Sequence, residues 1–317
     1  MLGNGSGSPG TALGALQVAN SDIASGNYSG AIAVLAPYCP NNNCVNADIA
    51  NADADAYIAM GNTATGATVT GLSTATASTT AGATITQILS TVLNLVNSNP
   101  SSKNVLQGVV QAIPCLSNNT CNTTYLDNLA TAIQVLANTP CSGPSSVATN
   151  CPDSSSILLA SAVYLLAVAQ YETGIVYANS TWETCTVHGG GLTGCSTTSL
   201  SSQESTLASE LTNGTNAPNR LQNIANILGA TSCSGCTGTA TITIPNGENA
   251  LNALPFFLAS MGTSNTNIVQ SFYQFLNSLS QCSASNATSG CLNNASGTSA
   301  SNLNINQNGI ALYLSQL

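Results

Sequence analysis

Few side chains in this sequence could carry out acid–base chemistry. The 317 residues include one histidine, His188, two firmly basic residues, Lys103 and Arg220, and eleven acidic residues. A general base must lie within hydrogen-bonding reach of other polarised groups. His188 stands instead between two cysteines, next to three consecutive glycines. This context indicates an exposed loop residue rather than a general base.

The acidic residues do not form a pattern that predicts catalysis. Asp48, Asp53 and Asp55 are close in sequence, but Asp53 and Asp55 are two positions apart on an expected helix and so do not share a face. A weak cation site is the alternative reading of this group. Glu172 could be a buried acid with a raised pKa, although its place near a helix end favours an exposed carboxylate. The chain has neither a phosphate-binding loop nor a nucleophile motif, and we therefore predict that it is not an enzyme and holds no cofactor or metal.

The twelve cysteines are the strongest chemical signal in the sequence. An even count in polar loops, with one histidine, is typical of disulfides in an oxidising compartment and not of a zinc site. Read in order, the cysteines form six short-range pairs: Cys39/Cys44, Cys115/Cys121, Cys141/Cys151, Cys185/Cys195, Cys233/Cys236 and Cys282/Cys291.

The last but one of these pairs has redox-motif spacing, Cys-Ser-Gly-Cys. It lacks the strand–helix–strand context of redox proteins, so we interpret it as a small structural loop.

The composition limits the partners of the protein. Charged residues make up 4% of the chain, whereas a soluble domain has about 25%. Two basic residues cannot form the positive patch that nucleic acid or an anionic membrane surface requires. A surface this poor in charge also lacks the repulsion that keeps proteins apart. We therefore expect a protein that sugars keep soluble or that assembles with itself.

Sequons for N-linked glycosylation are frequent. We treat the following as candidate sites: Asn4, Asn27, Asn118, Asn122, Asn179, Asn213, Asn286 and Asn294.

Export is the expectation that follows from the disulfides. No signal peptide is visible after Met1, so the sequence is expected to be the mature form or to begin close to it. The longest apolar run, Ile157 to Ala169, is shorter than the roughly 20 residues that span a membrane. We predict an extracellular or cell-surface protein with no transmembrane segment.

The same apolar run predicts the centre of the fold. It belongs to the stretch from Asp153 to Asn179 and is apolar on nearly every side, which is typical of a helix buried within a large protein. Spacing of apolar residues predicts further helices, and the fold class is therefore all-α. The expected helices cover residues 11–25, 28–35, 51–61, 84–97, 102–113, 124–137, 200–211, 219–228, 248–260 and 267–279.

One segment resembles a known repeat family. The pattern Gly26-Asn27-Tyr28-x-x-Ala31-Ile32-x-x-Leu35 resembles the hinge and second helix of a tetratricopeptide repeat, and Ala19 stands where that family has a small residue on the first helix. The Cys39–Cys44 loop replaces the proline that usually closes the unit, and Asn51–Gly61 resembles another first helix. The resemblance implies an array of antiparallel helical hairpins.

The sequence divides into three parts. Residues 1–10 form a Gly/Ser tail that is flexible or lies between subunits, residues 11–302 form the repeat-like domain, and residues 303–317 form a C-terminal arm. Thr239–Ile244 is predicted as a short strand or an extended arm. The C-terminal arm is either a strand or, at 310–317, a short docked helix. Either arm could pack locally or dock onto the next copy.

Two functions fit these expectations. The first is a structural subunit of an extracellular assembly, a filament or surface layer, which binds to itself. The second is a periplasmic or outer-membrane-associated helical scaffold that offers a groove to a protein, peptide or small ligand. The charge-poor surface favours the first.

Overall fold

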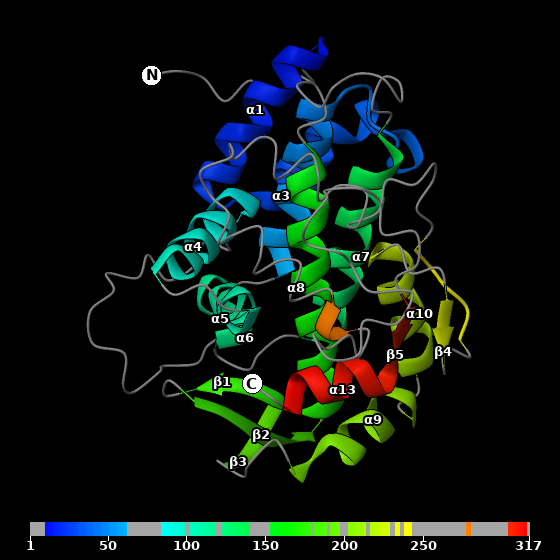
Figure 1. Ribbon diagram of the computed structural model, residues 1–317. Helices are drawn as coiled ribbons and strands as arrows, with labels where there is room; N and C mark the ends of the chain where they lie inside the picture. The colour runs from blue at the N-terminus through cyan, green and yellow to red at the C-terminus, as the bar shows by residue number, and fades with distance from the viewer. Residues whose placement is uncertain are drawn as a thin grey trace.

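The computed structural model describes residues 10–61, 84–98, 102–117, 122–139, 153–178, 181–188, 191–196, 202–213, 216–228, 232–234, 238–242, 277–279 and 304–315. These residues form a mostly helical molecule with two small sheets (Figure 1). The predicted helical class is thus confirmed in its main part, and the sheets add to it.

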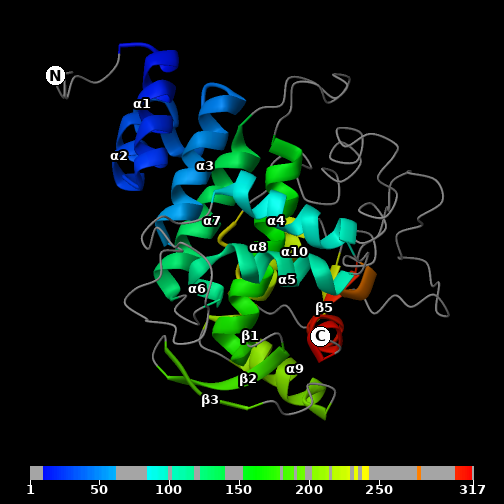
Figure 2. The ribbon, with the colours of Figure 1, turned by 90° about the vertical axis from the view of Figure 1, so that its left-hand side faces the viewer.

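The helix α8 (Asp153–Thr173) runs through the middle of the molecule in both views (Figures 1 and 2). Every residue from Leu159 to Gln170 is buried. A helix that is apolar on all sides needs neighbours on all sides. These are α7 (Thr123–Asn138) and α10 (Ala217–Leu228), with further helices on the remaining faces. The prediction of a central core helix is confirmed.

An antiparallel hairpin of α1 (Ala12–Ser25) and α2 (Tyr28–Leu35) forms one end of the molecule (Figure 2). The chain turns at Gly26, whose φ of 79° suits glycine. The side chain of Asn27 then caps α2 by accepting a hydrogen bond from the Gly30 N–H.

Small residues line the interface of this hairpin, as the resemblance implies. Ala15, Ala19 and Ala31 are fully buried, and Tyr28 fills the groove beside them with 5% of its surface exposed. The hairpin itself is therefore confirmed, while membership of the tetratricopeptide family stays a prediction.

Two short 3-10 helices, η1 (Ala36–Tyr38) and η2 (Pro40–Asn42), connect α2 to α3 (Ala47–Gly61). The disulfide Cys39–Cys44 closes this connection, as predicted. Beyond it, α3 packs against α7, which comes more than sixty residues later in the chain. The helices after the first hairpin thus gather around α8 rather than stacking in chain order.

The helices α4 (Ile85–Ser98) and α5 (Ser102–Ala112) form a second close pair, followed by the short α6 (Pro114–Ser117). A side chain at Gly108 would lie 2.7 Å from the Cα atom of Val92, so only glycine permits this approach.

A three-stranded antiparallel sheet lies at the end of the molecule opposite the first hairpin (Figures 1 and 2). Its strands are β1 (Ile175–Ala178), β2 (Thr181–His188) and β3 (Gly191–Ser196). Gly174 joins α8 to this sheet, with a φ of 68° and no room for a Cβ beside the Cys185 carbonyl. The residues around the predicted Cys185/Cys195 pair, among them His188, were expected to form a loop, and the structure corrects this to a β-hairpin.

The C-terminal segment packs on its own chain. The strand β5 (Asn304–Asn306) pairs in parallel with β4 (Ser232–Ser234), and α13 (Gln307–Ser315) packs against α9 (Glu204–Asn213). Ile310 and Leu314 are fully buried. The structure thus contains both predicted features, a strand of three residues and a docked helix, and the helix begins at Gln307 rather than at Ile310.

Helix prediction from the sequence was accurate where the structure describes the chain. The predicted helices at 84–97, 102–113, 124–137, 200–211 and 219–228 correspond to α4, α5, α7, α9 and α10. The prediction at 248–260 and most of that at 267–279 lie outside the described residues, as does the tail at 1–9. Among the helices described, none has the length and apolar character needed to cross a membrane.

We predict that truncation of α8 destabilises the whole molecule. Leu165 is 1% exposed at the centre of the core, so Leu165→Ala should lower the free energy of unfolding by about 2–5 kcal/mol. Leu13→Ala is the matched control, because Leu13 is 66% exposed on α1 and its truncation should cost well under about 1 kcal/mol. Urea unfolding followed by circular dichroism measures both, and equal losses in the two variants would contradict the central place of α8.

Candidate functional site

The charged side chains of the described residues are mostly turned inward. Among those whose exposure is described, only Asp48 and Asp127 are exposed. The others are buried or half-buried: Asp22, Asp53, Asp55, Glu172, Glu183, Glu204, Glu210 and Arg220. The outer surface of this part of the chain is therefore even poorer in charge than the composition requires.

Arg220, one of the two basic residues, forms an ion pair between α10 and α8. Arg220 binds Glu172, with 11% and 8% of the two side chains exposed, and the guanidinium lies 4.6 Å from the centre of the Tyr171 ring. Burial raises the pKa of Glu172, and the charge of Arg220 opposes this rise. The expectation of an exposed carboxylate at Glu172 was wrong, because its partner comes 48 residues later in the chain.

A row of asparagines on α10 holds an extended segment by its backbone. Asn219, Asn223 and Asn226 follow one another at helical spacing, on one face. The side-chain oxygen of Asn219 accepts a hydrogen bond from the Thr239 N–H at 2.8 Å. The Asn226 amide donates to the Ile242 carbonyl at 3.1 Å.

Asn223 is the centre of this row. Its oxygen accepts hydrogen bonds from the N–H groups of Thr241 and Ile242 at 2.8 and 3.0 Å. Its amide nitrogen donates to the Thr241 hydroxyl at 2.8 Å and to the Tyr164 hydroxyl on α8 at 3.2 Å. The segment at 239–244 had been predicted as a strand or arm. Its described residues, up to 242, are held by side chains of a helix and not by another strand, and the asparagine row was not foreseen.

The three acids of α3 have separate surroundings. The Asp55 carboxylate accepts a hydrogen bond of 2.7 Å from the Ile85 N–H and so caps the start of α4. Burial raises the pKa of Asp55 to about 6, although that hydrogen bond lowers it in part. Asp48 is exposed in the first turn of α3. The structure therefore does not bring Asp48, Asp53 and Asp55 together as a cation site.

Asp53 points instead toward the disulfide Cys39–Cys44. Its carboxylate oxygen and the two sulfur atoms all lie within 4.8 Å of one another, and all three residues are buried. Burial raises the pKa of Asp53 to about 7. Thiolates, and not disulfide sulfurs, are the metal-binding form of cysteine, so the bonded pair is not a ligand set.

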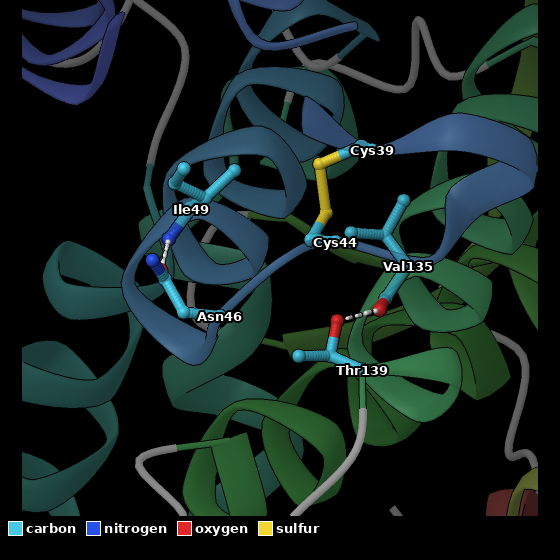
Figure 3. Close-up of a disulfide and its surroundings, with 6 residues drawn as sticks. All are labelled: Cys39, Cys44, Asn46, Ile49, Val135 and Thr139. Atoms are coloured by element: carbon cyan, nitrogen blue, oxygen red, sulfur yellow. Dashed lines mark hydrogen bonds between the residues drawn. A yellow bond between two sulfur atoms is a disulfide. The ribbon is translucent and has the colours of Figure 1, made fainter. Parts of the chain in front are cut away.

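Figure 3 shows the surroundings of this disulfide. Asn46 follows it and caps α3 by accepting a hydrogen bond from the Ile49 N–H at 3.0 Å. Val135 of α7 packs in the same apolar cluster, and one turn later the Thr139 hydroxyl donates to the Val135 carbonyl at 2.9 Å. The disulfide thus lies where α3 meets α7.

The remaining predicted disulfides are described only in part. Cys115 and Cys185 are disulfide-bonded, and no cysteine in the described ranges has a free thiol. The register of β2 and β3 places Cys185 opposite the Gly194–Cys195 bulge, in agreement with the predicted Cys185/Cys195 pair. The other pairings stay predictions, and Cys121, Cys141, Cys151, Cys236, Cys282 and Cys291 lie outside the described residues.

His188 ends β2, where its backbone pairs with Gly191. It therefore belongs to a hairpin strand and not to a loop as expected. The described acids Glu172, Asp53 and Asp55 come from α8 and α3, and each has the separate surroundings given above.

Three candidate glycosylation sites are described, and all three are exposed asparagines at helix ends. The Asn27 and Asn213 amides donate hydrogen bonds to Asp22 and Ser209. An attached sugar would disturb these bonds. Asn122 caps α7 through its oxygen, which a sugar on the nitrogen leaves in place. Asn4, Asn118, Asn179, Asn286 and Asn294 lie outside the described residues.

We predict that the protein loses stability as the pH rises from about 4 to about 7. The folded state holds the protons of Asp53 and Asp55 more tightly than the unfolded state, whose carboxyls titrate near 3.8. The contribution of these two acids to the free energy of unfolding is therefore fully present below their unfolded pKa. It falls as the pH rises through their folded pKa values, a loss on the order of several kcal/mol. Denaturant unfolding at about pH 4 and about pH 8 measures it.

Asp53→Asn should remove much of this pH dependence, because the amide does not titrate. Asp127→Asn is the control, since that acid is exposed on α7 and its loss should leave the pH dependence unchanged. A wild-type protein that becomes more stable over this pH range would show that these acids are not buried as described.

Comparisons with protein-family models, with curated proteins and with solved structures find no match to this chain.

Proposed function

We propose that this protein is a structural subunit of an extracellular assembly, a filament or a surface layer, which forms by self-association. The observation that carries the proposal is the inward placement of the charges. With Asp53, Asp55, Glu172 and Arg220 turned away from solvent, the described surface is covered by uncharged polar and small residues. Such surfaces approach one another without charge repulsion and without desolvating ions.

The first helix supports the same proposal. Leu13 and Val18 of α1 have 66% and 42% of their surfaces exposed, and Val45, before α3, has 60%. All three lie in or next to the first hairpin, at one end of the molecule (Figure 2). An end that presents apolar side chains among uncharged neighbours is suited to contact with another copy.

Export and a non-enzymatic role belong to this proposal. The disulfides Cys39–Cys44 and those of Cys115 and Cys185 favour an oxidising compartment, at the cell surface or outside the cell. Glu172 binds Arg220 and Asp55 caps a helix, so these two acids have structural partners. Glycans at sites such as Asn122 would keep the assembly hydrated.

A second candidate is a periplasmic or outer-membrane-associated scaffold of the tetratricopeptide type. The observation that favours it is the asparagine row of α10, which binds four backbone groups of an extended segment and so could bind an extended polypeptide. In the described structure the chain's own residues 239–242 occupy this row. The self-assembling subunit therefore accounts for more of the observations.

Electron microscopy of the purified, disulfide-intact protein separates the two candidates. We expect regular polymers or ordered sheets, because few charges on the described surface oppose contact between subunits. Uniform single particles at every concentration would contradict the structural role and favour the scaffold. A variant without residues 1–10 then tests the tail. Loss of the polymers would assign this tail to the contact between subunits, whereas unchanged polymers would assign the contact to the folded part.

A further inference from the structure

Asp53 is a buried acid without the partners that buried acids normally have. Only 4% of its surface is exposed, and its Oδ1 atom has no hydrogen-bond partner among the described residues. Buried polar atoms are nearly always hydrogen-bonded, and an exception calls for an explanation such as strain or a redox role. The two sulfur atoms of Cys39 and Cys44 lie within 4.8 Å of an oxygen of this carboxyl group.

The surroundings of this group are apolar. The cluster that contains the disulfide is built from alanines of α1, α2 and α3 together with Leu35, Ile49 and Val135. A carboxyl group in such surroundings is held in its neutral form and carries a proton that no neighbour takes up. The proton therefore lies next to a bond whose cleavage would create a strong base, the thiolate.

No charged neighbour interferes with this proton. Burial is the cause of the raised pKa of Asp53. The charge of Asp53 in turn contributes to the raised pKa of Tyr57, one turn later on α3. The helices packed against α3 carry no lysine, arginine or histidine. Their titratable groups, with the other acids of α3 itself, are Asp22, Tyr28, Asp48, Asp55, Tyr125, Asp127, Asp153, Tyr164, Tyr171 and Glu172.

We propose that Cys39, Cys44 and Asp53 form a thiol–disulfide exchange site, in which Asp53 donates a proton to the sulfur that leaves when a small thiol or dithiol opens the bond. The reductant is thus a low-molecular-weight thiol compound. The site is distinct from the self-association proposed above and does not depend on it.

The reaction balances as two successive displacements. The thiolate of a dithiol attacks the sulfur of Cys39, the more exposed of the pair at 8% against 2%. The S–S bond breaks, Cys44 leaves with the electron pair, and its sulfur takes the proton of the Asp53 carboxyl. The second thiol of the reagent, once deprotonated, attacks the mixed disulfide and releases the Cys39 thiolate. The reagent is oxidised to a cyclic disulfide, the protein pair is reduced, and solvent returns the proton to Asp53.

Proton donation matters because the departure of an unprotonated thiolate is the least favourable step of the exchange. A thiolate is a better leaving group when its basicity is lowered or when an acid protonates it as it leaves. A carboxyl is a stronger acid than a thiol, so the transfer from Asp53 to Cys44 runs downhill.

The test is the rate at which dithiothreitol reduces this disulfide in the full-length folded protein. Opened thiols are trapped by alkylation, and the peptide that contains Cys39 and Cys44 is quantified by mass spectrometry. The rate is divided by the concentration of reagent thiolate at each pH. For the wild type we expect this normalised rate to fall about tenfold or more as the pH rises through about 7 and Asp53 loses its proton.

Asp53→Asn should be slower by about tenfold or more at low pH and should show no pH dependence, because the amide has no proton to give. Asp55→Asn is the matched control, since this second buried acid lies on the same helix but caps α4 instead. It should keep the wild-type profile. A flat profile in the wild type, or the same fall in Asp53→Asn, would overturn the proposal and leave Asp53 a structural residue.

Discussion

The structure depends on covering one helix that has no polar side. Leu159 to Gln170 of α8 are buried all round, and the helix can exist in water only if other elements surround it. This requirement explains why α7, which precedes α8 in the chain, and α10, which comes after the sheet and α9, both pack on it. It also explains why the chain does not continue the hairpin order that its first two helices begin, since a core helix attracts neighbours from any position in the sequence.

Asparagine amides in this molecule make many of the hydrogen bonds that charged side chains often make in other proteins. Asn27, Asn46 and Asn122 cap three helices, and the asparagines of α10 satisfy the backbone of an extended segment. Amides supply hydrogen bonds at any pH and without the cost of desolvating an ion. Where two ionised groups are largely buried, as Arg220 and Glu172 are, they are partners of one another. A surface of this kind changes little with salt, because few of its charges can be screened.

Local features made much of this fold predictable. The apolar run of α8, the stripes of α4 and α7, and the small residues at Ala19 and Ala31 act within a few residues of one another, so the sequence predicted them correctly. The short disulfide Cys39–Cys44 was predictable for the same reason. The hairpin of β2 and β3 was not, because its cysteines and glycines are equally typical of a loop.

The candidate sites depended on contacts between distant residues and were therefore missed. Glu172 is buried only because Arg220 comes to it from another helix, and Asp53 faces a disulfide only because α3 folds back on the connection before it. The direction of a side chain on a helix can be derived from the sequence, but its partner across the interface cannot. The asparagine row at 219, 223 and 226 did leave a signal in its helical spacing, and a search for uncharged polar stripes would have found it.

If the charge-poor surface mediates self-association, sedimentation velocity of the intact protein tests it most directly. We expect the mean sedimentation coefficient to rise with protein concentration and to be nearly the same at about 0.05 M and about 0.5 M sodium chloride, because the contacts contain few charges. A coefficient that stays at the value of a single chain at all concentrations would contradict the claim. An association that high salt abolishes would also contradict it, since ionic contacts would then hold the copies together.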